Sequence, residues 1–190
     1  MTEDRLQIWL NILALVPLVA MLVLMSLWWV FFSAGRAPGP SIDIPWWLAL
    51  IVILLVVLPL HEFLQGVTIM LFGQRVRYGM KLSKGVLYAT SENALFRRDE
   101  YLAIALAPLV LITLAVMALM LVVPQALAYY IGIAAVLNAG GAIGDLWSVG
   151  VVLRYPASVL VRDEADGFRI YASSFAAGSS IQNTEPPAVG

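Results

Sequence analysis

The chain has 190 residues, of which 62% are hydrophobic and 12% charged, and its formal net charge at pH 7 is -1. Soluble domains carry about 25% charged residues, so this composition excludes an ordinary soluble protein. The sequence has no basic stripe, which excludes a nucleic-acid partner. Because the chain has no cysteine, a metal ion would have to be held by histidine, carboxylate, amide or water.

Four hydrophobic runs are each long enough to cross a hydrocarbon core of about 30 Å, which takes roughly 20 apolar residues. We therefore expect an all-α polytopic membrane protein with four transmembrane helices, small cytoplasmic β-hairpins and a single domain over residues 1–175. Residues 176–190 are small and polar, which predicts a mobile cytoplasmic tail. The expected spans are residues 7–32, 45–73, 101–123 and 126–153.

The basic residues predict the orientation of the spans. They are concentrated between the second and third spans, and none lies between the third and fourth. The positive-inside rule then places this segment and both termini in the cytoplasm. We expect an integral protein of a prokaryotic plasma membrane, with membrane lipids as partners of its helices. The basic residues of the segment are Arg75, Arg77, Lys81, Lys84, Arg97 and Arg98.

Two segments outside the spans predict β-hairpins. In residues 74–100, every second residue from Val76 to Met80 is apolar ahead of a Ser-Lys-Gly turn, and a second apolar run follows. Near the end of the chain, residues 159–161 and 168–171 flank an Asp-Gly pair that suits a tight turn.

The second span contains His61, the only histidine of the chain, and Glu62 follows it directly. An ionisable residue inside a membrane is costly to insert and usually marks a functional site. The pattern differs by one residue from H-E-x-x-H, in which two histidines on one helix face bind zinc and the glutamate is the general base. Here the fifth position is Gln65, and a neutral amide oxygen is a weak zinc ligand.

The fourth span contains Asn138 and a second buried charge, Asp145. Their spacing corresponds to about two helical turns, so the two residues share one helix face. At about 1.5 Å per residue, His61 lies roughly 18 Å and Asp145 roughly 12 Å from the cytoplasmic ends of their helices. The two side chains are therefore expected to meet at a similar depth.

These motifs resemble the site-2 protease type of intramembrane metalloprotease. They resemble more closely a bacterial family of small membrane proteins described as zincin peptidases, whose substrates are uncharacterised. The resemblance covers most of residues 45–172. It rests on His61-Glu62, on Asn138 with Gly144-Asp145-Leu146, and on residues 95–101 and 166–171.

The resemblance implies a hydrolase with zinc as its cofactor. His61 and Asp145 would bind the metal, with Gln65 in the place of the second histidine, and Glu62 would be the catalytic base. Asn138 would contact the substrate, which would be a membrane protein or peptide. Related proteases also present a strand edge to unwound substrate, which gives the first hairpin a role in β-augmentation.

Gln65 keeps a second function open, a pseudoprotease that retains the fold and acts as a membrane adaptor or regulator. A third interpretation is a small transporter that uses His61, Glu62 and Asp145 as a proton relay. Four spans without inverted repeats favour a transporter less. The simplest alternative is a buried polar pair that only fixes the packing of the helices.

Overall fold

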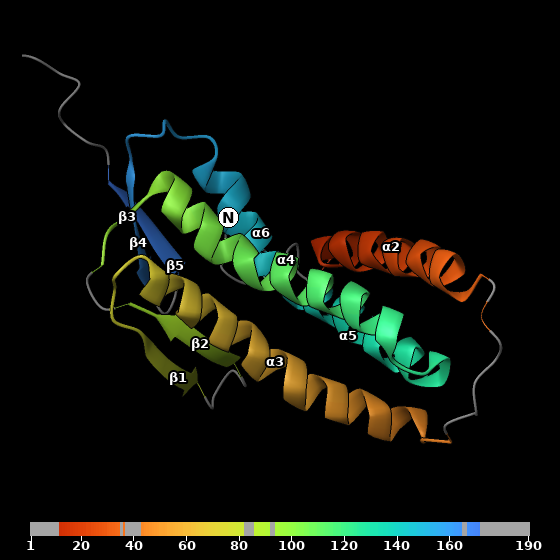
Figure 1. The fold of residues 1–190 in the computed structure, drawn as a ribbon. Helices are drawn as coiled ribbons and strands as arrows, with labels where there is room; N and C mark the ends of the chain where they lie inside the picture. Colours follow the sequence, from red (N-terminus) through yellow and green to blue (C-terminus); the bar gives the residue numbers. More distant parts are fainter. Residues whose placement is uncertain are drawn as a thin grey trace, which may run out of the picture.

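In the computed structural model, the long helices lie side by side and the short strands gather at one end of them (Figure 1). The structure describes residues 12–34, 36, 43–81, 86–91, 94–164 and 167–171. Four sequence predictions fall wholly or partly outside these residues: the start of the first span, the turn of the first hairpin, Asp166 of the second turn and the tail from residue 176.

The helices confirm the expectation of a mostly helical protein. Helices α2 (Leu15–Ser33), α3 (Trp46–Leu71) and α4 (Arg98–Val122) are each long and apolar enough to cross a membrane. Helices α5 (Gln125–Gly141) and α6 (Ile143–Val152) make a fourth span if the bent pair crosses as one unit. The architecture is thus compatible with an integral membrane protein.

The segment expected to form the fourth span is broken in the structure. Helices α5 and α6 meet at Ala142 with a bend of 47°. Glycine is less favourable than alanine in a helix by about 1 kcal/mol, and Gly140 and Gly141 end α5 just before the break. The break places Asp145 in the first turn of a new helix, not two turns further along α5.

Helix α5 lies at the centre of the helical packing, where it contacts α2, α3 and α4. The buried core between these helices includes Met25 of α2 with Ile112 and Met120 of α4. Trp29 of α2 also packs edge-on against Tyr129 of α5, with the ring centroids 6.2 Å apart. Leu64 of α3 packs against the same core, which brings α3 and α5 together so that their polar residues can meet.

Two small sheets lie at one end of the helices (Figure 1). Strands β1 (Arg77–Lys81) and β2 (Val86–Thr90) form an antiparallel hairpin that contacts α3, which confirms the first predicted hairpin. Strands β4 (Leu160–Glu164) and β5 (Gly167–Tyr171) form the second. Strand β3 (Phe96–Arg97) pairs with β4 and was not expected, because two residues are too few for an alternating pattern to be recognised.

A second apolar core joins the three-stranded sheet to the helices. Phe96 and Val161 are partners across β3 and β4, and their exposed fractions are 1% and 0%. They belong to one cluster with Ile69 of α3, Ile104 of α4 and Val152 of α6. The sheet therefore holds these parts of the three helices in place relative to one another.

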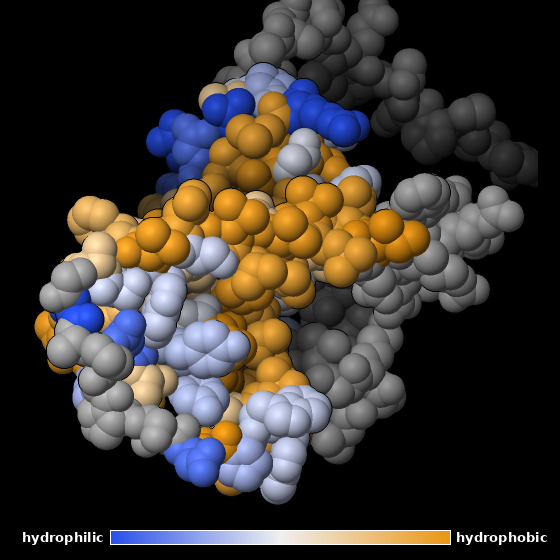
Figure 2. Space-filling view, turned by 90° about the vertical axis from the view of Figure 1, so that its right-hand side faces the viewer, coloured by the Kyte–Doolittle hydropathy of each residue, from blue (hydrophilic) through white to orange (hydrophobic). Residues whose placement is uncertain are grey.

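Large apolar side chains cover the outer faces of the helices. Val30 of α2 is 67% exposed and Leu55 of α3 is 70% exposed. Figure 2 shows a broad apolar face, in orange, with hydrophilic residues gathered toward its margins. Because soluble monomers rarely expose large contiguous apolar patches, this surface suits an environment of lipid chains.

We predict that Gly66→Ala loosens the first hairpin from α3. A Cβ atom at Gly66 would overlap the ring of Tyr78, whose hydroxyl donates to the carbonyl oxygen of Phe63 at 3.4 Å. Hydrogen exchange of the amides in β1 and β2 should become about fivefold faster, equivalent to about 1 kcal/mol. Gly150→Ala is the matched control, because a Cβ there meets no described atom within 4 Å. Equal exchange rates in the two variants would contradict this prediction.

Candidate functional site

The side chains of His61 and Asp145 meet, as the depth argument predicted. His61 lies in α3 and Asp145 in the first turn of α6, 84 residues later in the chain. The Nε2 atom of His61 is 3.0 Å from Oδ2 of Asp145. The two side chains are 12% and 23% exposed, so the contact lies inside the bundle with limited access from outside.

Asn138 of α5 lies on the other side of the same imidazole ring. Its Oδ1 atom is 2.8 Å from Nδ1 of His61. Its Nδ2 atom donates to the carbonyl oxygen of Pro108 in α4 at 3.4 Å. The residue is 2% exposed, and its amide therefore links α3, α4 and α5. The substrate contact expected of Asn138 stays a prediction.

Gln65 also contacts the pair formed by His61 and Asp145. It follows His61 by one helical turn, and its Nε2 atom donates to Oδ1 of Asp145 at 3.4 Å. Both carboxylate oxygens of Asp145 therefore face polar atoms of α3. The amide occupies the place that the second imidazole has in H-E-x-x-H.

Glu62 lies beside the pair and connects it to the first hairpin. The backbone N–H of Ala89 in β2 donates to the Glu62 carboxylate, and the charges of His61 and Asp145 are near enough to act on that carboxylate. One carboxylate oxygen, Oε2, is buried and finds no hydrogen-bond partner within the described part of the chain. A buried polar atom without a partner in a native structure calls for a functional or structural explanation.

Sequence reasoning missed the groups that hold Asp145 in place. The hydroxyl of Ser148 donates to the backbone carbonyl of Asp145 at 2.8 Å. The side chain of Tyr101, at the start of α4, is hydrogen-bonded to Ser148. Tyr101 and Ser148 are 6% and 7% exposed. The only signal for Ser148 was its position one turn after Asp145, and such a serine is common in helices.

The donor atoms can be tested against zinc, the cofactor that the resemblance implies. Imidazole nitrogen and carboxylate oxygen are ordinary zinc ligands, and two ligands of a tetrahedral zinc ion lie about 3.3 Å apart. The separation of 3.0 Å between Nε2 of His61 and Oδ2 of Asp145 is close to that value. Among the residues that the structure describes, no group of three or more His, Cys, Asp or Glu side chains could hold a metal ion. His61 and Asp145 thus fit zinc as two ligands. Gln65 also contacts Asp145, and its amide, which would bind a metal through its oxygen, is a weaker ligand.

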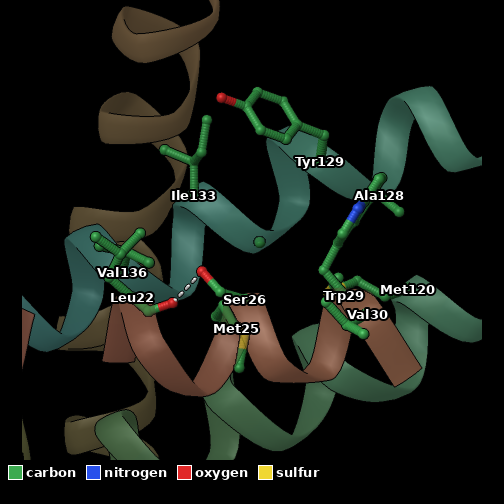
Figure 3. A pocket seen from close by; sticks show the side chains of 11 residues that line it. Leu22, Met25, Ser26, Trp29, Val30, Met120, Ala128, Tyr129, Ile133 and Val136 are labelled. Atoms are coloured by element: carbon green, nitrogen blue, oxygen red, sulfur yellow. Dashed lines mark hydrogen bonds between the residues drawn. The ribbon is translucent and has the colours of Figure 1, made fainter. Parts of the chain in front are cut away.

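An apolar cavity of about 310 Å³ lies apart from these polar residues, between α2, α4 and α5 (Figure 3). Its lining includes Leu22 and Trp29 of α2, Met120 of α4 and Ile133 of α5. The hydroxyl of Ser26, a polar group of this lining, donates to the carbonyl oxygen of Leu22 at 2.7 Å. The cavity suits a hydrocarbon chain and carries none of the predicted site residues.

Comparison with protein families gave a match to a family model described as "Putative zincin peptidase". The match covers residues 54–160, which is more than half of the chain. It runs from α3 to the first residue of β4 and includes all five predicted site residues. Comparisons with curated proteins and with solved structures gave no match.

We predict that Gln65→His strengthens zinc binding. The new imidazole would lie one turn from His61 and face Asp145, as the amide does now, and would complete a set of three strong ligands. Zinc affinity, measured by titration against a competing chelator in detergent micelles, should rise by at least about tenfold, or about 1.4 kcal/mol.

Phe63→His is the control for this substitution, because it adds an imidazole to the same helix at a residue that is 53% exposed. It should leave zinc affinity unchanged. If Phe63→His and Gln65→His had the same effect, the position of Gln65 in the site would be irrelevant to metal binding.

Proposed function

The chain belongs to the putative zincin peptidase family, and on that premise we propose that it is an intramembrane zinc metallopeptidase of the site-2 protease type. Its substrate would be a peptide bond of a membrane protein or of a peptide at the membrane. The observation that carries the proposal is the contact of 3.0 Å between His61 and Asp145, two ionisable residues brought together from separate apolar helices. Such residues are expensive inside a membrane and are retained mainly for function.

In this proposal His61 and Asp145 hold the zinc ion, with Gln65 as a weak third contact. When bound, zinc supplies a Lewis acid that activates water and polarises the peptide carbonyl. The hydrogen bond between Ser148 and the Asp145 backbone lies within α6, and Tyr101, hydrogen-bonded to Ser148, connects this turn to α4. The low exposure of His61 and Asp145 limits the entry of bulk water, which strengthens the electrostatic interactions within the site.

Glu62 acts as the general base. Its Oε2 atom has no hydrogen-bond partner in the described chain, so its lone pairs are unused and would be available to a water that enters the site with the substrate. The Ala89 amide is hydrogen-bonded to the carboxylate, which helps to keep the side chain in one orientation. After attack on the carbonyl carbon, the same carboxyl group returns the proton to the leaving amine nitrogen, and the peptide C–N bond breaks.

The first hairpin would hold the substrate near Glu62. Strand β2 is joined to Glu62 through Ala89, and the hairpin also contacts α3. An extended peptide that pairs with this hairpin would gain main-chain hydrogen bonds without strict sequence choice. Its scissile bond would then lie close to the polar residues of α3.

A pseudoprotease is the second candidate function. The observation that favours it is Gln65, whose amide nitrogen donates to Asp145 where an active zincin has an imidazole. In this case the fold would bind a membrane partner as an adaptor or regulator. Stoichiometric zinc in the purified chain would count against it. Proteolysis gained only on Gln65→His would support it.

We predict that Glu62→Gln lowers peptide hydrolysis by at least about 100-fold, because general base catalysis contributes about 10²–10⁴-fold. The assay would follow cleavage of a fluorogenic transmembrane peptide in proteoliposomes loaded with zinc. Zinc content should stay at the wild-type level, since Glu62 is not a proposed ligand.

Glu100→Gln is the matched control for this variant. Glu100 accepts a hydrogen bond from the backbone of Arg97 at the start of α4, and glutamine can keep that cap. The control should cleave at the wild-type rate. Full activity of Glu62→Gln would rule out Glu62 as the base.

A further inference from the structure

We propose that Asn138 is a positioning residue that fixes the proton of the His61 ring on Nδ1 and turns Nε2 toward Asp145. The position of the proton does not depend on the proposed function. Only its consequence, that the site is prepared to bind zinc, rests on that proposal. The position of the proton itself is a property of the chain, and it can be measured without metal or substrate.

The orientation of the Asn138 amide is set by α4. The Nδ2 atom donates to the carbonyl oxygen of Pro108 at 3.4 Å, and a carbonyl oxygen can only accept. A flipped amide would place Oδ1 against that carbonyl, so that two acceptors would face each other in a site where Asn138 is 2% exposed. The oxygen of the amide therefore faces His61.

The orientation of the amide determines which ring nitrogen carries the proton. Oδ1 of Asn138 lies 2.8 Å from Nδ1 of His61, and an amide oxygen has no hydrogen to donate. Nδ1 must therefore be the donor. In the neutral ring, Nε2 then presents a lone pair to Oδ2 of Asp145 at 3.0 Å.

Two acceptor atoms at that distance repel each other unless a proton or a metal ion lies between them. In the metal-free chain a second proton on Nε2 would make this contact a hydrogen bond to Asp145, and zinc would take the place of that proton. A metal-binding histidine generally shows the same arrangement, in which one ring nitrogen donates to a protein oxygen and the other is left for the metal. By accepting the Nδ1 proton, Asn138 would thus leave Nε2 of His61 available to bind zinc. This role differs from the substrate contact predicted for Asn138 from the sequence.

The test uses the fact that His61 is the only histidine of the chain. Protein labelled with ¹⁵N-histidine gives one pair of ring nitrogen signals, and their chemical shifts report which nitrogen carries the proton. We expect Nδ1 to be protonated in the wild-type chain, in detergent micelles, both without metal and with zinc.

Asn138→Ala removes the acceptor at Nδ1. In the metal-free variant the neutral ring should then carry its proton on Nε2, where Asp145 can accept it. Zinc affinity, measured against a competing chelator, should fall about 10–100-fold, as it does when such outer partners are removed.

Thr113→Ala is the matched control. Thr113 is a buried polar residue of α4 whose hydroxyl donates within its own helix, to Leu109. It should leave the ring signals and the zinc affinity unchanged.

A wild-type spectrum with an unprotonated Nδ1 would overturn the proposal by itself, even if Asn138→Ala failed to fold. An unaltered tautomer in folded Asn138→Ala would also overturn it. A chain that binds no zinc but shows the expected shift of the proton would contradict the metallopeptidase proposal and uphold the role of Asn138.

Discussion

An imidazole inside an apolar helix bundle depends on the protein for its hydrogen bonds, because lipid chains offer none. In this structure both ring nitrogens of His61 are met, one by Asn138 and the other by Asp145. A buried polar group left without a partner costs about 1–3 kcal/mol. Because the partners belong to α5 and α6, satisfying one ring fixes α3 against both helices. The positions of Glu62 and Gln65 on α3 follow from that arrangement.

The break at Ala142 explains how two residues of one segment can flank a single ring. In a straight helix, residues seven positions apart lie about 10.5 Å apart along the axis, which is long compared with an imidazole and its two hydrogen bonds. The bend of 47° between α5 and α6 changes the direction of the chain between Asn138 and Asp145. Glycines near the break make the helix easy to interrupt there. A polar site is thus built from a weak point in an apolar helix.

The sequence predicted much of this arrangement and missed parts of it for physical reasons. Apolar runs and alternating segments were sufficient to predict the long helices and both hairpins, since these patterns follow from burial. The meeting of His61 and Asp145 followed from their similar depth. The break at Ala142 was missed because a run of small residues also suits close helix packing. The Ala89 amide was missed because backbone donors leave no trace in the sequence.

The bond between Ala89 and Glu62 has a consequence for how the molecule could evolve. Ala89 pairs with Tyr78 across the hairpin, and the ring of Tyr78 covers Gly66 on α3. Helix α3 and the hairpin therefore contact each other at two neighbouring points. Exchanging this hairpin for an unrelated one would remove the Ala89 amide from the Glu62 carboxylate. Helix α3 and the hairpin are therefore expected to change together in evolution, as one structural unit.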